Sequence, residues 1–498
     1  MPTSPAESRY DVAVLGAGPA GLAAAVSASQ AGARVALLDS AARPGGQYWR
    51  NRGDADSGAL HHDWSTFRAL RGELRGRIDH LAQHAVWHAE HDEHGLDLYA
   101  LCDGAERIVR AAALVLATGA YDRQLPFPGW TLPGVFTAGA VQALLKGHGV
   151  LAGRRIAVAG TGPFLLAVAA GLAQSGADVV GVFEAGHPAE FARFPGALAR
   201  NPAKLTEGAR YLATLARHRI PYHPRTAVIA AHGDGELNQI ITATLTREWQ
   251  VVPGSETPVD CDTLAVGYGF TPQLEIPLQL GCDTRLDVDG SLVAIADSRQ
   301  RSTRERVYLA GEVCGVAGAA ASVVEGHLAG LAAAEDVLAA TPDPKQLRRL
   351  RRQRGSLRSF AHAMHTAFPV PAGWIGWVTP DTTVCRCEEV DARTVEAAID
   401  ELGAADPRAV KLYARPGMGL CQGRVCGYAT TCLLAAREGR TPTADDLRSL
   451  TARPIANPIK LGVIAAGQRT GPQTKPAGAN STELKNYSVQ CHMRHVIL

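Results

Sequence analysis

The chain has 498 residues, of which 46% are hydrophobic and 20% charged, with a mean hydropathy of −0.03. Its 50 Lys and Arg against 48 Asp and Glu leave a net charge of +2, which excludes binding of nucleic acid or membranes through bulk charge. No apolar run reaches the roughly 18 residues needed to span a bilayer. At about 150 residues per domain, the length predicts roughly three domains of a globular protein.

The N-terminus lacks the pattern of a secretory signal. Residues 1–9 have neither a basic segment nor an apolar one. We therefore expect a cytoplasmic protein.

Residues 10–39 predict a strand, a glycine turn, a helix and a second strand. The first strand is expected over Tyr10–Leu15, the helix over 22–30 and the second strand over 34–38. This order of elements is that of a βαβ unit with a parallel sheet.

The turn of this unit reads Gly-x-Gly-x-x-Gly. Gly16 permits the tight turn, Gly18 lets a pyrophosphate approach the backbone, and Gly21 allows close packing of helix on strand. Asp39, after the second strand, is placed to accept hydrogen bonds from a ribose. Strand, turn, helix and acid together predict a dinucleotide site.

A second unit of the same kind begins about 144 residues later. A strand over 154–159, a helix over 164–175 and a strand over 178–183 are expected. The repeat predicts a second Rossmann-like domain.

The glycine turn of the second unit is incomplete. Gly160 and Gly162 are present, but Leu165 stands where the third glycine is usual. Glu184 suits a free ribose hydroxyl and repels a 2′-phosphate, so NAD is favoured over NADP. Either NAD or another adenine nucleotide such as ATP binds here, or the pocket is only structural; the sequence leaves both readings open.

Further elements are expected between and after these units. Buried strands are predicted over 113–119, 263–269 and 306–311, and an Ala-rich helix over 317–334. The basic segment 345–358 is predicted to be helical, either with a solvated face or as a docking surface for an acidic partner.

Four cysteines form the most specific motif. They occur as Cys385-x-Cys387 and, after 33 intervening residues, Cys421-x-x-x-x-Cys426. Two close thiolate pairs suit an iron–sulfur cluster or zinc, and the single-residue spacer is unusual for structural zinc. We expect a [2Fe–2S] cluster, with zinc or uncommitted thiols as alternatives. Asp391 is the expected N-cap of an intervening helix.

Several phrases resemble one family, the flavoprotein α subunits of heteromeric amine dehydrogenases. Its members include the A subunit of opine (octopine) oxidase, the B subunit of hydrogen cyanide synthase and the α subunit of dye-linked proline and hydroxyproline dehydrogenases. The resemblance covers about residues 9–465. The phrases that carry it are Arg43–Gln47, Leu125–Val135, Gly160–Pro163, Glu325–Gly326 and Gly417–Cys426.

The resemblance implies an α/β fold of two nested dinucleotide-binding domains, with a small helical C-terminal domain similar to bacterioferritin-associated ferredoxin. It implies FAD at the first unit. Glu312 would bind the flavin's ribityl or phosphate region, although the family more often has Asp there. The helix from about Ala319 would point its N-terminus at the flavin pyrimidine. The remaining implied FAD-binding residues are Gln47, Thr118, Gly119 and Gly311.

The expected domain boundaries follow from these motifs. The FAD domain covers 9–152 and returns over 266–340, and the second Rossmann-like domain covers 153–265. A basic linker (341–380), the [2Fe–2S] domain (381–455) and an extension with a flexible tail (456–498) complete the chain.

The resemblance implies a subunit that relays electrons between a separate catalytic subunit and an acceptor. The implied partners are a β subunit similar to D-amino-acid oxidase, a small ferredoxin-like subunit as a further candidate, and a downstream acceptor that could bring the chain to the inner membrane face. No catalytic residue is assigned. Two alternatives remain: a self-sufficient NADH:acceptor oxidoreductase using Gly160, Gly162 and Glu184, and a non-enzymatic scaffold. The amine substrate is left open between opine, proline, hydroxyproline and glycine.

Overall fold

The computed structural model describes residues 9–53, 56, 58–93, 95–451 and 454–468. The chain divides into two units, residues 1–458 and 459–498. The described part of the second unit holds one helix, α14 (Leu461–Gln468). The tail predicted from about residue 474 lies outside the described residues.

The first sheet is built around the N-terminal strand. The parallel strands run in the order β3-β2-β1-β6-β19, and β5 and β4 continue the sheet antiparallel from the first half of β6. The bounds are β1 (Tyr10–Leu15), β2 (Val35–Leu38), β3 (Ile78–Leu81), β4 (Ala85–Asp92), β5 (Gly95–Cys102), β6 (Ala105–Leu116) and β19 (Val307–Leu309).

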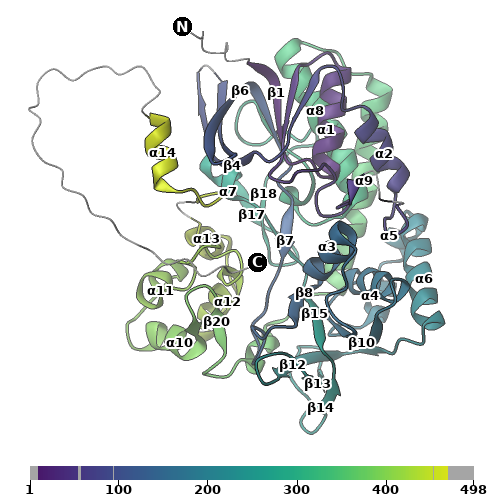
Figure 1. Ribbon diagram of the computed structural model, residues 1–498, viewed down its shortest axis with the longest axis vertical. Helices are drawn as coiled ribbons and strands as arrows, with labels where there is room; N and C mark the ends of the chain where they lie inside the picture. Colours follow the sequence, from purple (N-terminus) through teal and green to yellow (C-terminus); the bar gives the residue numbers. More distant parts are fainter. Residues whose placement is uncertain (1–8, 54–55, 57, 94, 452–453, 469–498) are drawn as a thin grey trace, which may run out of the picture. The chain divides into compact units, whose positions relative to one another are not determined.

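Two helices distant in sequence cover this sheet side by side, α1 (Pro19–Gln30) and α8 (Ala319–Leu338) (Figure 1). Their backbones touch through glycines. A Cβ on Gly326 would lie 2.1 Å from the Ala20 carbonyl oxygen, and one on Gly330 would lie 2.2 Å from that of Ala24. The close approach lets the chain return to the first domain after about 300 residues.

The second sheet is parallel, in the order β11-β10-β9-β15-β8, with a separate antiparallel sheet β12-β13-β14. The helices of this domain are α3 (Ala138–His148), α4 (Phe164–Gln174), α5 (Pro195–Ala199) and α6 (Pro202–Arg217). The strands are β8 (Val135–Thr137), β9 (Arg155–Gly160), β10 (Asp178–Glu184), β11 (Tyr222–Pro224), β12 (Thr226–His232), β13 (Gln239–Thr244), β14 (Thr257–Asp260) and β15 (Thr263–Gly267).

A two-stranded ribbon joins the two sheets. It consists of β7 (Ala120–Asp122) and β16 (Phe270–Pro272), which pair antiparallel. The chain leaves the first sheet along β7 and comes back along β16. Short elements near this ribbon and elsewhere in the first domain are α2 (Trp64–Gly72), α7 (Glu275–Gln279), β17 (Thr284–Leu286) and β18 (Leu292–Ala294).

The basic segment folds as helix α9 (Pro344–Ala367), which packs on α8. The cysteine domain follows with its own apolar core. Asp391 caps α10 by accepting from the Thr394 N–H at 2.8 Å, as expected. Its elements are β20 (Thr383–Cys385), β21 (Val390–Asp391), α10 (Ala392–Asp400), α11 (Pro407–Ala414), α12 (Gly427–Arg437) and α13 (Ala444–Ser449).

This architecture confirms the predicted class, two Rossmann-like sheets followed by a small helical domain. Each predicted strand and helix of the two βαβ units is present within a few residues of its expected bounds. None of the helices in the described ranges is long and apolar enough to cross a membrane.

Candidate cofactor sites and the junction between them

The first glycine turn is shaped for close approach of a ligand. Gly16 has φ +102°, and a Cβ there would lie 2.4 Å from the Ala117 carbonyl oxygen. A Cβ on Gly21 would overlap the Gly16 carbonyl oxygen. At Gly18, by contrast, the nearest atom to a Cβ is 3.8 Å away, and no side chain caps the N-terminus of α1. Free N–H groups at the start of a helix, beside an open glycine, fit a pyrophosphate.

Asp39 orders this turn. One carboxylate oxygen accepts from the Ala17 N–H at 2.6 Å and the other from the Ala41 N–H at 2.7 Å. Asp39 is only half-buried, so it remains partly accessible to a ligand. Gly46 also packs on Gly18, which brings the exposed Gln47 beside the same turn.

Two later segments, after strands β6 and β19, return to this turn. Because β6 and β19 pair in register, Thr118, Gly119 and Gly311 follow the strand ends at the same edge of the sheet as Gly16. Thr118 donates its hydroxyl to the Gln273 carbonyl oxygen at 2.8 Å, which ties the edge to the residue after β16. These residues fit FAD at this edge.

Glu312 lies just ahead of α8. Its carboxylate accepts from the Gly318 N–H at 2.9 Å, and burial raises its pKa to about 7. The neighbouring Glu325 is 0% exposed and pairs with Arg358 at 2.7 Å and Arg354 at 3.2 Å, both from α9. Glu325 also accepts from the Gly311 N–H at 3.1 Å, so α9 fixes the Gly311 turn through α8.

In the second unit the acidic residue, Glu184, is buried. Glu184 is 1% exposed and accepts from the Thr161 hydroxyl, the Gly162 N–H and the Gly186 N–H, each at 2.8 Å. Burial raises the pKa of Glu184 to about 7. A ring carbon of Phe368 lies 3.1 Å, and a Glu184 oxygen 3.0 Å, from the point that a Cβ on Gly186 would occupy. Because Glu184 is 1% exposed, little of its carboxylate is accessible to a ribose.

The cysteine motif is assembled as two pairs. Cys385, at the end of β20, is hydrogen-bonded to Cys426, which precedes α12, and Cys387 interacts with Cys421. Among the described residues, no set of three or more His, Cys, Asp or Glu side chains could hold a single metal ion. Two pairs suit a cluster in which each of two irons takes two thiolates, better than one tetrahedral zinc.

The electrostatics favours the thiolate at Cys385. The Cys426 thiol and the N–H groups of Gly417, Glu388 and Cys387 donate to Cys385, which lowers the pKa of Cys385 to about 5. The same contact raises the pKa of Cys426, whose proton is held against that thiolate. N–H donors of this kind also stabilise the sulfurs of an anionic cluster. The donor set fits a [2Fe–2S] cluster.

Trp130, from the two-sheet part of the chain, contacts the segment around the first cysteine pair, Cys385 and Cys387. The indole N–H of Trp130 donates to the Thr383 carbonyl oxygen at 2.6 Å, two residues before Cys385. The Arg386 guanidinium lies 6.0 Å from the centre of the same indole. Trp130 therefore contacts the phrase both before and after Cys385.

Two arginines hold the second phrase. Arg424 pairs with Glu275 at 2.6 Å and donates to the Cys421 carbonyl oxygen at 3.2 Å. Arg123, which follows β7 and is 2% exposed, lies 4.4 Å from the ring centre of Tyr428, two residues after Cys426. Arg123 is in turn paired with Asp289 at 3.1 Å.

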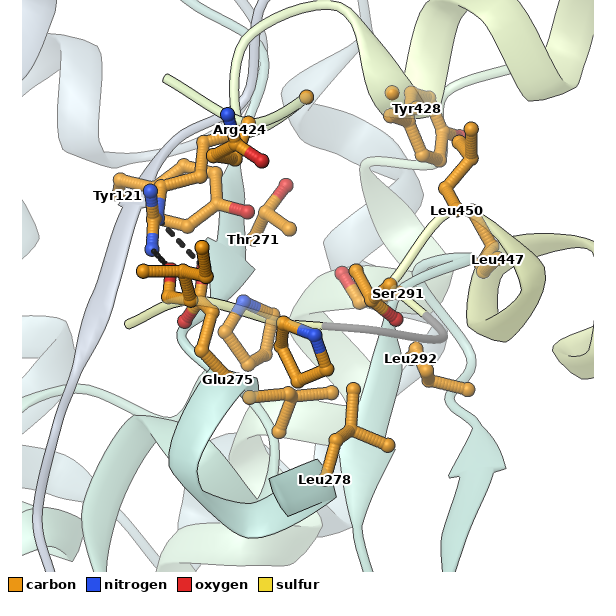
Figure 2. Close-up of a pocket in the computed structure, with 18 of the residues that line it drawn as sticks. Tyr121, Thr271, Glu275, Leu278, Ser291, Leu292, Arg424, Tyr428, Leu447 and Leu450 are labelled. Carbon is orange, nitrogen blue, oxygen red and sulfur yellow. Dashed lines mark hydrogen bonds and ion pairs between the residues drawn. The ribbon is translucent and has the colours of Figure 1, made fainter. Parts of the chain in front are cut away.

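A cavity of about 90 Å³ marks this junction between body and cysteine domain. In Figure 2, Tyr121, Arg424 and Glu275 gather on one side of it, and Tyr428, Leu447 and Leu450 on the other. Pockets for small molecules usually measure about 300–1,000 Å³, so the cavity is a packing seam rather than a cofactor site.

Sequence reasoning missed this junction. Arg123, Trp130 and Tyr428 gave no periodic or spacing signal, because each acts on a partner more than 160 residues away. Trp130 lay within a phrase singled out for its resemblance, without a role. Phe368 was missed for the same reason, since its place near Gly186 depends on the path of α9.

Comparison with known families agrees with these two sites. Residues 10–330 match the pyridine nucleotide-disulphide oxidoreductase family, and residues 383–436 match the BFD-like [2Fe-2S] binding domain. The second match spans all four cysteines. The cofactors predicted from the sequence, FAD and a [2Fe–2S] cluster, are thereby confirmed.

Similar proteins share nearly the whole length. The chain is 34% identical over 439 residues to hydrogen cyanide synthase subunit HcnB of Pseudomonas aeruginosa, covering 85% of this chain and 92% of that one. It is 32% identical over 484 residues to the A subunit of opine oxidase of Rhizobium meliloti, covering 92% and 87%. The alpha subunit of sarcosine oxidase of Corynebacterium sp. is 28% identical, and the match covers 46% of that protein.

Solved structures share the fold. L-proline dehydrogenase from P. horikoshii superposes with a TM-score of 0.66 at 20% identity, covering 92% of this chain and 79% of that one. Thioredoxin reductase of T. acidophilum covers 66% of this chain with a TM-score of 0.50.

The glycine turn, the four paired cysteines and these matches lead to one conclusion. The chain is an FAD-dependent oxidoreductase subunit that belongs to the family of hydrogen cyanide synthase subunit HcnB and the A subunit of opine oxidase, in which a pyridine nucleotide-disulphide oxidoreductase body is joined to a BFD-like [2Fe-2S] domain.

Proposed function

We propose that this chain is the electron-relaying α subunit of a heteromeric amine dehydrogenase, such as one that oxidises an opine or an amino acid. Its catalytic partner would be a β subunit similar to D-amino-acid oxidase. A small ferredoxin-like subunit is a further candidate partner. Electrons would pass through the chain to a downstream acceptor. The names of the relatives, each a subunit of an oxidase or synthase, support a multi-chain enzyme.

One observation carries the relay. Tyr121 stands two residues after Gly119, at the edge that fits FAD, and it lines the junction cavity together with Glu275 and Arg424. The ribbon strand β7 therefore runs from the edge that fits FAD to the cavity lined by residues of the second cysteine phrase. Bound FAD exchanges two electrons at once or one at a time, and a [2Fe–2S] cluster carries one. The chain's own residues hold the two sites against each other.

We assign no residue of this chain to amine chemistry. The cavity at the junction is too small for an amino-acid-derived opine beside a flavin, and the carboxyls with raised pKa values at the two nucleotide units, Glu184 and Glu312, already accept backbone N–H groups. Oxidation of the amine would then fall to the partner chain.

NADH is the second candidate electron donor, through Gly160, Gly162 and Glu184. The burial of Glu184 speaks against it, because the residue is only 1% exposed and a ribose would have little of its carboxylate to reach. We infer that the second unit orders the fold and does not deliver hydride.

The test is anaerobic reduction of the purified holoprotein, alone and co-expressed with a D-amino-acid-oxidase-like subunit from the same organism. The probes are octopine, proline, hydroxyproline and glycine. We expect bleaching of the flavin of this chain only when the partner is present. Oxidation of any of these amines at the full rate by the isolated chain would overturn the proposal.

A further inference from the structure

A basic groove is lined by residues that are assigned to neither cofactor. Its volume is about 890 Å³, within the range of pockets that bind small molecules. Helix α9 forms one wall, and the turn between α5 and α6 forms the other. Neither the relay nor the family relationship uses it.

The wall from α9 presents four cations on one face. Lys345, Arg348, Arg349 and Arg352 are spaced by three, four and seven residues, which places them on the same side of a helix. All four are exposed. Among the described residues, the ion pairs of α9 are those that Arg354 and Arg358 form with Glu325, so these four side chains have no carboxylate partner there.

The opposite wall adds two cations and a helix start. Arg200 and Lys204 line the groove, and α6 begins beside them at Pro202 without a side-chain cap. The lining contains two acids. Glu207 forms an ion pair with Lys204 at 2.8 Å, and Asp63 lies 3.5 Å from His62. The balance of six Lys and Arg against two carboxylates leaves the groove strongly positive.

The groove is fixed in shape rather than formed by loose side chains. The buried Asn201 donates its amide to the carbonyl oxygens of Ala197 at 2.9 Å and Ser356 at 3.3 Å. Arg200 donates to the Ser359 hydroxyl at 3.2 Å. These contacts fasten α9 to the start of α6, so the two basic walls keep their separation.

We propose that this groove binds a small molecule carrying a chain of phosphates, such as a nucleoside diphosphate or triphosphate. Arginine forks match phosphate oxygens in pairs, and the six Lys and Arg side chains of the lining face one concave space. A concave site of this volume suits a small ligand better than the flat contact expected of a protein surface. Ala320, at the start of α8, lines the same groove and places the ligand beside the helix expected to face the flavin.

The experiment is calorimetric titration of the full-length holoprotein, at low ionic strength, with inorganic tripolyphosphate and with ATP. The test variant is Arg348→Gln combined with Arg352→Gln. Its matched control is Arg351→Gln, an exposed arginine of the same helix that does not line the groove. The visible spectrum and thermal midpoint of each variant report that it folds and keeps its cofactors.

We expect saturable one-to-one binding of tripolyphosphate. Because hydrogen bonds between charged groups are the strong ones, the double variant should weaken binding by about ten-fold or more, and the control by less than about two-fold. Tighter binding of ATP than of tripolyphosphate would also support the proposal. Absence of saturable binding, or equal weakening by control and test variants, would overturn it. So would tight binding of poly-glutamate without tripolyphosphate binding, which would assign the groove to an acidic protein partner.

Discussion

The guanidinium of Arg123 stacks on the ring of Tyr428 at 4.4 Å, and this contact joins the flavoprotein body to the iron–sulfur domain. Arg123 follows the ribbon strand that leaves the flavin edge, and Tyr428 opens the helix that starts after Cys426. Asp289 and the Phe270 carbonyl oxygen hold the arginine in place from behind. The contact therefore sets how the helix after Cys426 lies on the body.

Replacing Tyr428 tests that role. A desolvated cation–π contact is worth about 2 kcal/mol, so Tyr428→Leu should speed amide exchange in α12 on the order of thirty-fold. Tyr428→Phe keeps the ring and should leave exchange within about two-fold of the original. Hydrogen exchange followed by mass spectrometry measures both. Equal protection in the two variants would show that the ring is not what holds the helix.

Gly419 is needed for the cluster. A Cβ there would lie 2.4 Å from the Cβ of Cys387, and overpacking of this kind costs about 1–3 kcal/mol. We expect Gly419→Ala to lose most of its iron while keeping FAD, as measured by iron and flavin analysis. Gly376→Ala is the matched control, because a Cβ at that position meets nothing within 4 Å. Full iron content in Gly419→Ala would contradict the assignment of Cys387 to the cluster.

The Glu325 pair with α9 should govern flavin retention. Breaking a buried ion pair from one side costs about 3–5 kcal/mol, and Glu325→Gln also weakens the contact with the Gly311 N–H. We expect the variant to melt at a lower temperature and to lose FAD on dialysis. Glu305→Gln, in an exposed pair with Arg306, should change neither property. Unchanged FAD retention in the Glu325 variant would show that the ion pair with α9 does not support FAD binding.

The contribution of Glu184 to the free energy of unfolding should fall as pH rises. Its pKa in the folded protein is raised to about 7, above the ordinary value of 4.5, because burial disfavours the charged form. Its contribution is full below pH 4.5 and is lost as pH rises toward 7, by about 3 kcal/mol in all. The thermal midpoint relative to Glu184→Gln should therefore fall from pH 5 to pH 8. A difference that stayed level or rose would refute the raised pKa.

The two nucleotide units and the cysteine domain could be predicted because their signals are local. Glycines at fixed spacing, a strand ahead of Gly16 and an acid at Asp39 or Glu184 all lie within about 30 residues, which is the length of one βαβ unit. The cysteine pairs likewise have a spacing that limits the metal chemistry. These patterns specify the class of fold and the cofactors.

The arrangement of these parts could not be predicted in the same way. The basic segment 345–358 has the charge pattern of a solvated face, yet Arg354 and Arg358 turn inward to Glu325 because α9 packs along α8. Glu184 has the position of a ribose acceptor, yet it is buried, and Phe368, directly after α9, packs near Gly186 in the loop that follows it. Both outcomes depend on where a distant helix lies, and the spacing of residues within a motif carries no information on that.

The relay itself is tested most directly by following both centres in one experiment. The anaerobic holoprotein is given one electron equivalent, rapidly frozen at increasing times, and examined by EPR and flavin absorbance. We predict that the signal of a reduced [2Fe–2S] cluster grows as flavin reduction decays within one chain, and that Tyr428→Leu slows this exchange. A cluster and flavin that fail to equilibrate, or a preparation in which the four cysteines hold zinc, would contradict the account.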